Sequence, residues 1–78
     1  MTWRYMAAVT EYGGEEVWSI REVYYANQNG GVGWTADDID PHGGTREELI
    51  TDLKHMLADV EDGAVLDLRT ETITGFLS

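Results

Sequence analysis

The fold is decided by the stretch that begins Gly43-Gly44-Thr45-Arg46-Glu47-Glu48 and ends at Gly63. Thr45 followed three residues later by Glu48 forms a capping box, in which each side chain satisfies a free backbone donor. Gly63 suits the C-cap because glycine enters the left-handed conformation without steric cost. These signals predict a helix over residues 46–61, about 24 Å long.

Apolar residues recur along this segment with the spacing of one helix face. The predicted stripe, which we expect to pack on a sheet, comprises Leu49, Leu53, Met56, Leu57 and Val60. A polar flank carries Glu48, Asp52, His55 and Asp59. Like charges four residues apart cost a helix about 0.2–0.5 kcal/mol, so displaying this acidic flank carries a small penalty.

The charge of the chain is strongly acidic, with 15 acids, 5 bases and a net charge of −10 over 78 residues. Residues 37–62 alone contain nine acids and two bases. This balance argues against direct binding to nucleic acid or to an anionic membrane, because both attract cationic surfaces. It favours a basic protein surface as partner, or it serves solubility alone.

The length predicts a single domain over residues 1–78 with a small core. The chain has no cysteine, so a disulfide or a thiolate metal site is excluded. Its N-terminus lacks a basic region followed by an apolar run, so we expect no signal peptide. No apolar stretch approaches the roughly 18 residues that a membrane span requires.

Three strands are predicted before the helix. Alternating residues from Trp3 to Thr10 have the period of a strand, and 11–16 with its two glycines reads as a hairpin turn. Residues 17–25 are mostly β-branched or aromatic, which predicts a second strand. The Asn29-Gly30 pair in 26–31 predicts a second turn, and 32–36 a short third strand.

The remaining segments complete an α+β prediction. Residues 64–68 form either a short fourth strand or an extended segment, and 70–78 pair at an edge or fray. We therefore expect a three- to four-stranded antiparallel sheet, arranged as a meander, with one helix packed on one face. Both faces of the second strand carry apolar residues. The face away from the helix is then covered by the C-terminal segment or by a partner.

Two sequence elements resemble those of the HicB-like antitoxin fold. They are the hairpin over Glu11–Gly14 and the helix start over Gly43–Glu48, and the resemblance spans about two-thirds of the chain. It implies a small domain that neutralises a basic toxin by covering the toxin's active site.

The chain is also similar in type to phage-encoded anti-CRISPR proteins and other DNA mimics, which are small, acidic and without catalytic motifs. This resemblance implies a partner with a basic nucleic-acid-binding channel, such as a CRISPR effector complex in the cytoplasm of a bacterial host cell. We expect a monomer or weak dimer there. The acids expected to stand in for phosphates are Asp37, Asp38, Asp40, Glu47, Glu48, Asp52 and Asp59.

Catalysis and cofactor binding are not predicted. Ser19 and Ser78 are the only serines, and neither lies in a Gly-x-Ser-x-Gly elbow. The glycines of 30–33 are followed by neither a lysine nor a helix, so they form no phosphate loop. We therefore expect a protein that is not an enzyme.

Metal binding is also not predicted. Asp38 to Gly43 resembles the first half of a calcium loop, but its twelfth position is Leu49, where a bidentate glutamate is required. His55 lies at helical spacing from Asp52 and Asp59, whereas a zinc site needs three or four ligands in register. We expect a solvated acidic loop and a solvent-facing histidine.

Three aromatic residues can serve either as core or as anchors for a partner. Trp34, Tyr24 and Tyr25 are of the type that dominates interface hot spots. A chain this short needs large side chains for its own core, so we expect them inside. Three functional hypotheses remain open, namely a nucleic-acid mimic, an antitoxin-like domain and a structural domain whose acidity serves only solubility.

Overall fold

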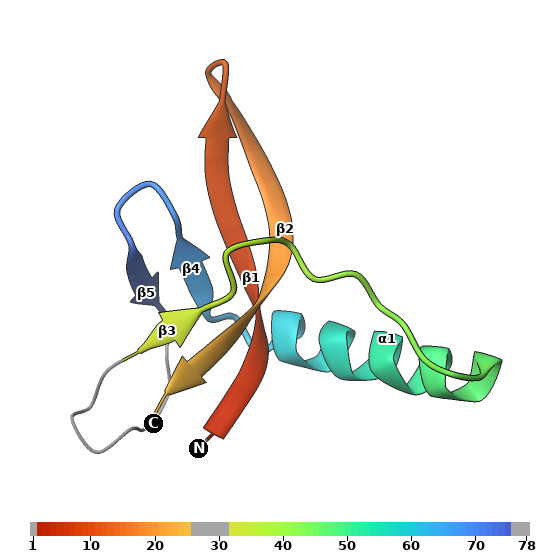
Figure 1. Cartoon of the computed structure of the whole chain (residues 1–78). Helices are drawn as coiled ribbons and strands as arrows, with labels where there is room; N and C mark the ends of the chain where they lie inside the picture. The colour runs from red at the N-terminus through yellow and green to blue at the C-terminus, as the bar shows by residue number, and fades with distance from the viewer. Residues whose placement is uncertain (1, 26–31, 76–78) are drawn as a thin grey trace.

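The computed structural model describes residues 2–25 and 32–75. Within them the elements are β1 (Thr2–Tyr12), β2 (Glu15–Tyr25), β3 (Gly33–Trp34), α1 (Arg46–Glu61), β4 (Val65–Asp67) and β5 (Thr72–Thr74). Figure 1 shows a curled sheet with α1 to one side and the far end of the β1–β2 hairpin projecting beyond the other strands. The predicted α+β class is confirmed.

Within the described residues the sheet has five strands, more than the three to four predicted, in the order β3-β2-β1-β4-β5. The first three form the predicted antiparallel meander, because β2 pairs antiparallel with both β1 and β3. The prediction of a wholly antiparallel sheet is wrong, since β4 pairs parallel with β1. The reason is the helical crossover between β3 and β4. The helix α1 carries the chain from β3 to the far edge of β1, where β4 enters the sheet in the same direction as β1.

Turn chemistry sets the register of the long hairpin. Gly13 and Gly14 have φ of 60° and 86°, and Tyr12 pairs with Glu15 across this two-residue loop. Positive φ at both central residues matches the twist of the flanking strands. The second predicted turn, over 26–31, lies outside the described residues. The third strand spans only Gly33–Trp34, shorter than the predicted 32–36.

The helix begins and ends where the sequence predicts, at Arg46 and Glu61. Thr45 Oγ1 accepts the Glu48 N–H at 3.1 Å, which is the first half of the capping box. The Glu48 carboxylate instead accepts the N–H of Gly44, at 2.7 Å. Asp62 rather than Gly63 is the C-cap, and Gly63 follows it with φ of 97°.

The core lies on the sheet face away from α1. Strand alternation places Met6 and Ala8 opposite to Tyr5, whose side chain contacts the helix. The fully enclosed cluster comprises Met6, Ala8, Val23, Ala64 and Leu66, with Trp34, Leu68 and Ile73 packed against it. The curl of the sheet therefore buries the second face with the chain's own strands.

The aromatic residues divide between these two faces. Trp34 is half-buried against the core, as expected. Tyr24 is half-buried on the opposite face, where its hydroxyl donates to the carboxylate of Glu22. The side chain of Tyr25 lies outside the described part of the structure.

The apolar stripe of α1 does not pack as predicted. Met56 is buried, whereas Leu53 and Leu57 are 46% and 58% exposed. The helix is rotated so that the boundary between its polar and apolar faces meets β1. The physical reason is a set of hydrogen bonds between the acidic flank and β1.

Candidate partner-binding surfaces

The acidic flank of α1 is bonded to its own sheet. Asp52 Oδ1 accepts the hydroxyl proton of Tyr5 at 2.5 Å, and Asp52 Oδ2 accepts the backbone N–H of His42 at 3.0 Å. These bonds hold the pKa of Asp52 below its usual range, with the Tyr5 hydroxyl as the largest cause. The same carboxylate thus ties together the helix, β1 and the loop that precedes the helix.

Asp59 has a comparable role about two helical turns further on. Its Oδ2 accepts the backbone N–H of Tyr5 at 3.1 Å, at the part of β1 that precedes the β4 pairing. His55 Nε2 lies 3.2 Å from the same oxygen. Arg4 donates to the backbone carbonyl of Asp59 and forms an ion pair with Asp62 at 2.9 Å. The Asp59 carboxylate therefore accepts the backbone N–H of Tyr5 at an edge of β1 where no described strand pairs with it.

A hollow of about 450 Å³ opens beside these bonds. Its lining includes Tyr5, His42, Glu48, Asp52 and His55. Burial and the adjacent Asp52 raise the pKa of the Tyr5 hydroxyl, while the pKa of Asp52 is lowered. General acid–base catalysis at neutral pH favours pKa values near 7, so both shifts move away from that optimum. In the described residues no three His, Cys, Asp or Glu side chains group to hold a metal ion.

This Tyr5–Asp52 bond predicts a specific pH dependence of stability. A carboxyl whose pKa is lower in the folded state adds stability above its unfolded pKa of about 3.9, and that stability is lost as the pH falls through the folded pKa. We expect wild type to exceed Tyr5→Phe in stability at about pH 6, and the difference to shrink below about pH 4. Urea unfolding of both proteins across this range measures it. A constant difference would contradict the lowered pKa.

The acids of the loop between β3 and α1 face solvent. Asp37, Asp38 and Asp40 are all exposed. Asp38 accepts the Arg21 Nε–H at 3.0 Å, and Arg21 also donates to the carbonyls of Thr35 and Ala36. The carboxylates of Asp37 and Asp40 form no hydrogen bond or ion pair among the described residues. The loop runs beside β2, because the N–H of Ile39 donates to the carbonyl of Ile20.

The helix N-terminus adds two further exposed acids, Glu47 and Glu48. Glu48 is occupied as a cap, whereas the Glu47 carboxylate has no partner in the described structure. Of the seven acids predicted to bind a partner, Asp52 and Asp59 are half-buried, and Asp38 and Glu48 have intramolecular partners. The acids that remain free are Asp37, Asp40 and Glu47.

A second exposed surface, which the sequence argument missed, lies on the hairpin arm. Tyr12 and Val17, on one face of the arm, are 69% and 39% exposed, and Trp18, on the other face, is 55% exposed. Glu11, Glu15 and Glu16 surround them and are also exposed. The sequence feature that could have indicated this exposure is the position of these residues next to the Gly13-Gly14 turn. At that end, β1 and β2 extend beyond the other strands of the sheet.

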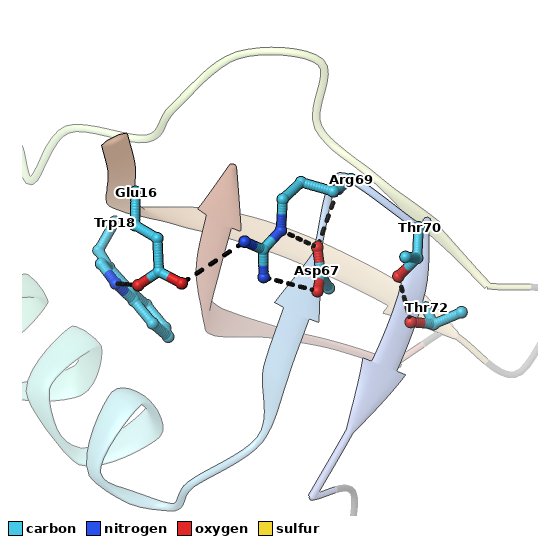
Figure 2. Close-up of polar contacts among 6 residues, drawn as sticks. All are labelled: Glu16, Trp18, Asp67, Arg69, Thr70 and Thr72. Carbon is cyan, nitrogen blue, oxygen red and sulfur yellow. Dashed lines mark hydrogen bonds and ion pairs between the residues drawn. The ribbon is translucent and has the colours of Figure 1, made fainter. Parts of the chain in front are cut away.

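One side of this arm is joined to the β4–β5 turn. Figure 2 shows the Arg69 guanidinium between Glu16 and Asp67. Arg69 lies 3.0 Å from Asp67 Oδ1 and 3.5 Å from Glu16 Oε2, and Glu16 also accepts the indole N–H of Trp18 at 3.3 Å. The Arg69 bonds lower the pKa of Asp67. This network joins the arm, through Glu16, to the β4–β5 turn.

Comparison of the chain with protein-family models, curated proteins and solved structures gives no match. Among the described residues, no helix is long and apolar enough to cross a membrane.

Proposed function

We propose that this chain is an acidic, non-enzymatic binding module that occupies a basic, nucleic-acid-binding surface of another protein. The observation that supports it is the exposure of three carboxylates without a partner in the described structure, those of Asp37, Asp40 and Glu47. They sit on exposed backbone that the Ile39 and His42 N–H bonds hold against β2 and α1. Negative charges held in fixed positions attract a basic partner during encounter, and they compete with nucleic-acid phosphates for its basic surface.

The most specific form of this proposal is anti-CRISPR-like inhibition, in which the carboxylates exclude target DNA from a CRISPR effector complex. The mimic set is smaller than the sequence suggested, because Asp52 and Asp59 bond to β1. Of the remaining set, Asp37 and Asp40 lie on the loop and Glu47 lies on the first turn of α1. Binding of this kind weakens as salt rises.

The test is target-DNA binding by purified, guide-loaded effector complexes, measured by mobility shift with and without the protein. We expect inhibition at low salt. The triple variant Asp37→Lys, Asp40→Lys and Glu47→Lys should weaken inhibition by at least about tenfold, because it reverses three charges at the contact. Failure of the wild-type protein to inhibit any effector complex at low salt would overturn this form of the proposal.

A second candidate is an antitoxin-like domain that covers a small basic toxin. Exposed Tyr12 and Val17, which share one face of the hairpin arm with Glu15, favour it, because an aromatic anchor beside a charge suits a protein surface better than a phosphate site. The matched variant Glu11→Lys, Glu15→Lys and Glu71→Lys carries the same charge change; Glu11 and Glu15 are on the arm, and Glu71 is exposed in the β4–β5 turn to which the arm is joined. Loss of partner binding in this variant, with the loop variant unaffected, would favour the antitoxin-like function.

A further inference from the structure

The exposed side of α1 carries a stripe that none of the proposed functions uses. Ile50, Leu53 and Leu57 are 39%, 46% and 58% exposed, and they follow one another at spacings of three and four residues. Arg46 begins the same line four residues earlier, and Glu61 ends it four residues later. The stripe is therefore apolar in its middle, basic at one end and acidic at the other.

An apolar recess adjoins the stripe. It has a volume of about 290 Å³ and lies between α1, β2 and the loop at Pro41. Its lining comprises Ile20, Pro41, Leu53, Met56, Leu57 and Val60. Apolar side chains brought against the stripe can enter this recess and leave water.

The charges on this side of α1 distinguish it from the rest of the molecule. Arg4, Arg21 and Arg69 each form ion pairs with acids. Arg46 and Lys54 form none in the described residues, and both lie beside the stripe. Glu47 and Glu61 balance them, so this face is locally neutral on a chain of net charge −10. Arg46 and Lys54 would repel a basic partner from this face. Two copies of the chain, which repel each other elsewhere through their negative charge, repel each other least at this neutral face.

We propose that α1 pairs with α1 of a second copy, antiparallel about a two-fold axis between residues 53 and 54. This arrangement sets Arg46 opposite Glu61 of the second copy, and Ile50 opposite its Leu57. Leu53 meets its own equivalent at the axis. A parallel pair would instead place Arg46 against Arg46 and Glu61 against Glu61, so the end charges select the antiparallel arrangement.

The first test is the molar mass in solution as a function of concentration, by sedimentation equilibrium at physiological salt. We expect about 17 kDa at high concentration, twice the 8.7 kDa of one chain. Leu53→Asp places two carboxylates at the axis and should raise the dissociation constant by at least about a hundredfold. Circular dichroism checks that this variant is folded. A monomer at all concentrations, or a dimer that Leu53→Asp leaves intact, would overturn the proposal.

The end charges provide a second test that does not depend on the apolar core of the pair. Arg46→Glu and Glu61→Arg should each weaken self-association by about tenfold, because each turns two attractive pairs into repulsive ones. An equimolar mixture of the two variants should restore wild-type association as a heterodimer, since each repulsive pair becomes attractive again. Association of the mixture no tighter than that of either variant alone would refute the antiparallel pairing.

Lys54→Glu is the matched control for these charge variants. It makes the same change of charge as Arg46→Glu on the same side of the helix, yet Lys54 lies next to the axis and faces its own equivalent. Like charges face each other before and after the substitution, so we expect less than about a threefold change in the dissociation constant. An effect as large as that of Arg46→Glu would show that net charge alone governs association, and would overturn the proposal.

Discussion

Leu66→Ala is expected to lower the free energy of unfolding by about 3 kcal/mol. Leu66 is completely buried in β4, at the centre of the cluster on the sheet face away from α1. Removing a buried leucine side chain costs its transfer free energy and leaves a cavity, in total about 2–5 kcal/mol. A domain of this length has about 4–12 kcal/mol of stability, so the substitution removes much of it. Urea unfolding monitored by tryptophan fluorescence measures the loss.

Leu57→Ala is the control for this substitution. The two leucines have the same side chain, but Leu57 is 58% exposed on α1. At a concentration low enough to dissociate the proposed α1 pair, we expect a change within about 0.5 kcal/mol, as for most surface positions. Equal losses from the two substitutions would show that the apolar stripe of α1 packs on the sheet, contrary to the structure.

Asp59→Ala should destabilise the protein by about 2 kcal/mol, because it leaves the N–H of Tyr5 without an acceptor. Tyr5 is only 5% exposed, so water cannot easily replace the lost carboxylate oxygen. The loss should be accompanied by faster hydrogen exchange at the Tyr5 amide. Hydrogen-exchange mass spectrometry or NMR therefore distinguishes this mechanism from a general loss of stability.

Asp59→Asn separates the hydrogen bond from the charge. Its amide oxygen can accept the Tyr5 N–H, although its attraction to His55 is weaker than that of the carboxylate. We expect Asn to retain more than half of the stability that Ala loses. An Asn variant as unstable as the Ala variant would mean that charge, rather than the backbone hydrogen bond, holds the helix to β1.

Local signals in the sequence were sufficient for much of this fold. The Gly13-Gly14 turn and the Thr45–Glu48 cap are decided by residues a few positions apart, and both the hairpin and the bounds of α1 agree with prediction. The pairing of β4 with β1 depends on residues far apart in the chain. Turn residues determine only the pairing of neighbouring strands, so nothing in the sequence indicated that β4 pairs parallel with β1 and that the sheet is mixed.

The rotation of the helix was also beyond the sequence. Periodicity placed Leu53 and Leu57 in the core, but it assigns no weight to polar bonds. The bonds from Tyr5 to Asp52 and Asp59 turn the acidic flank toward β1 and the leucines toward solvent. For the same reason two of the acids predicted to bind a partner are half-buried. The loop acids, whose exposure needs no tertiary information, were easier to predict.

The position of β1 has a consequence for how the protein is made. Of the five described strands, β1 is synthesised before the others and its neighbour β2 follows at once, but the strand on its other edge, Val65–Asp67, comes only after α1. A nascent chain that has reached the end of α1 therefore carries a paired hairpin with one bare edge and no Leu66 to close its core. Folding must wait for this distant segment, and the cost of closing so long a loop makes it slow. The nascent hairpin is thus the stage most open to pairing with a wrong strand.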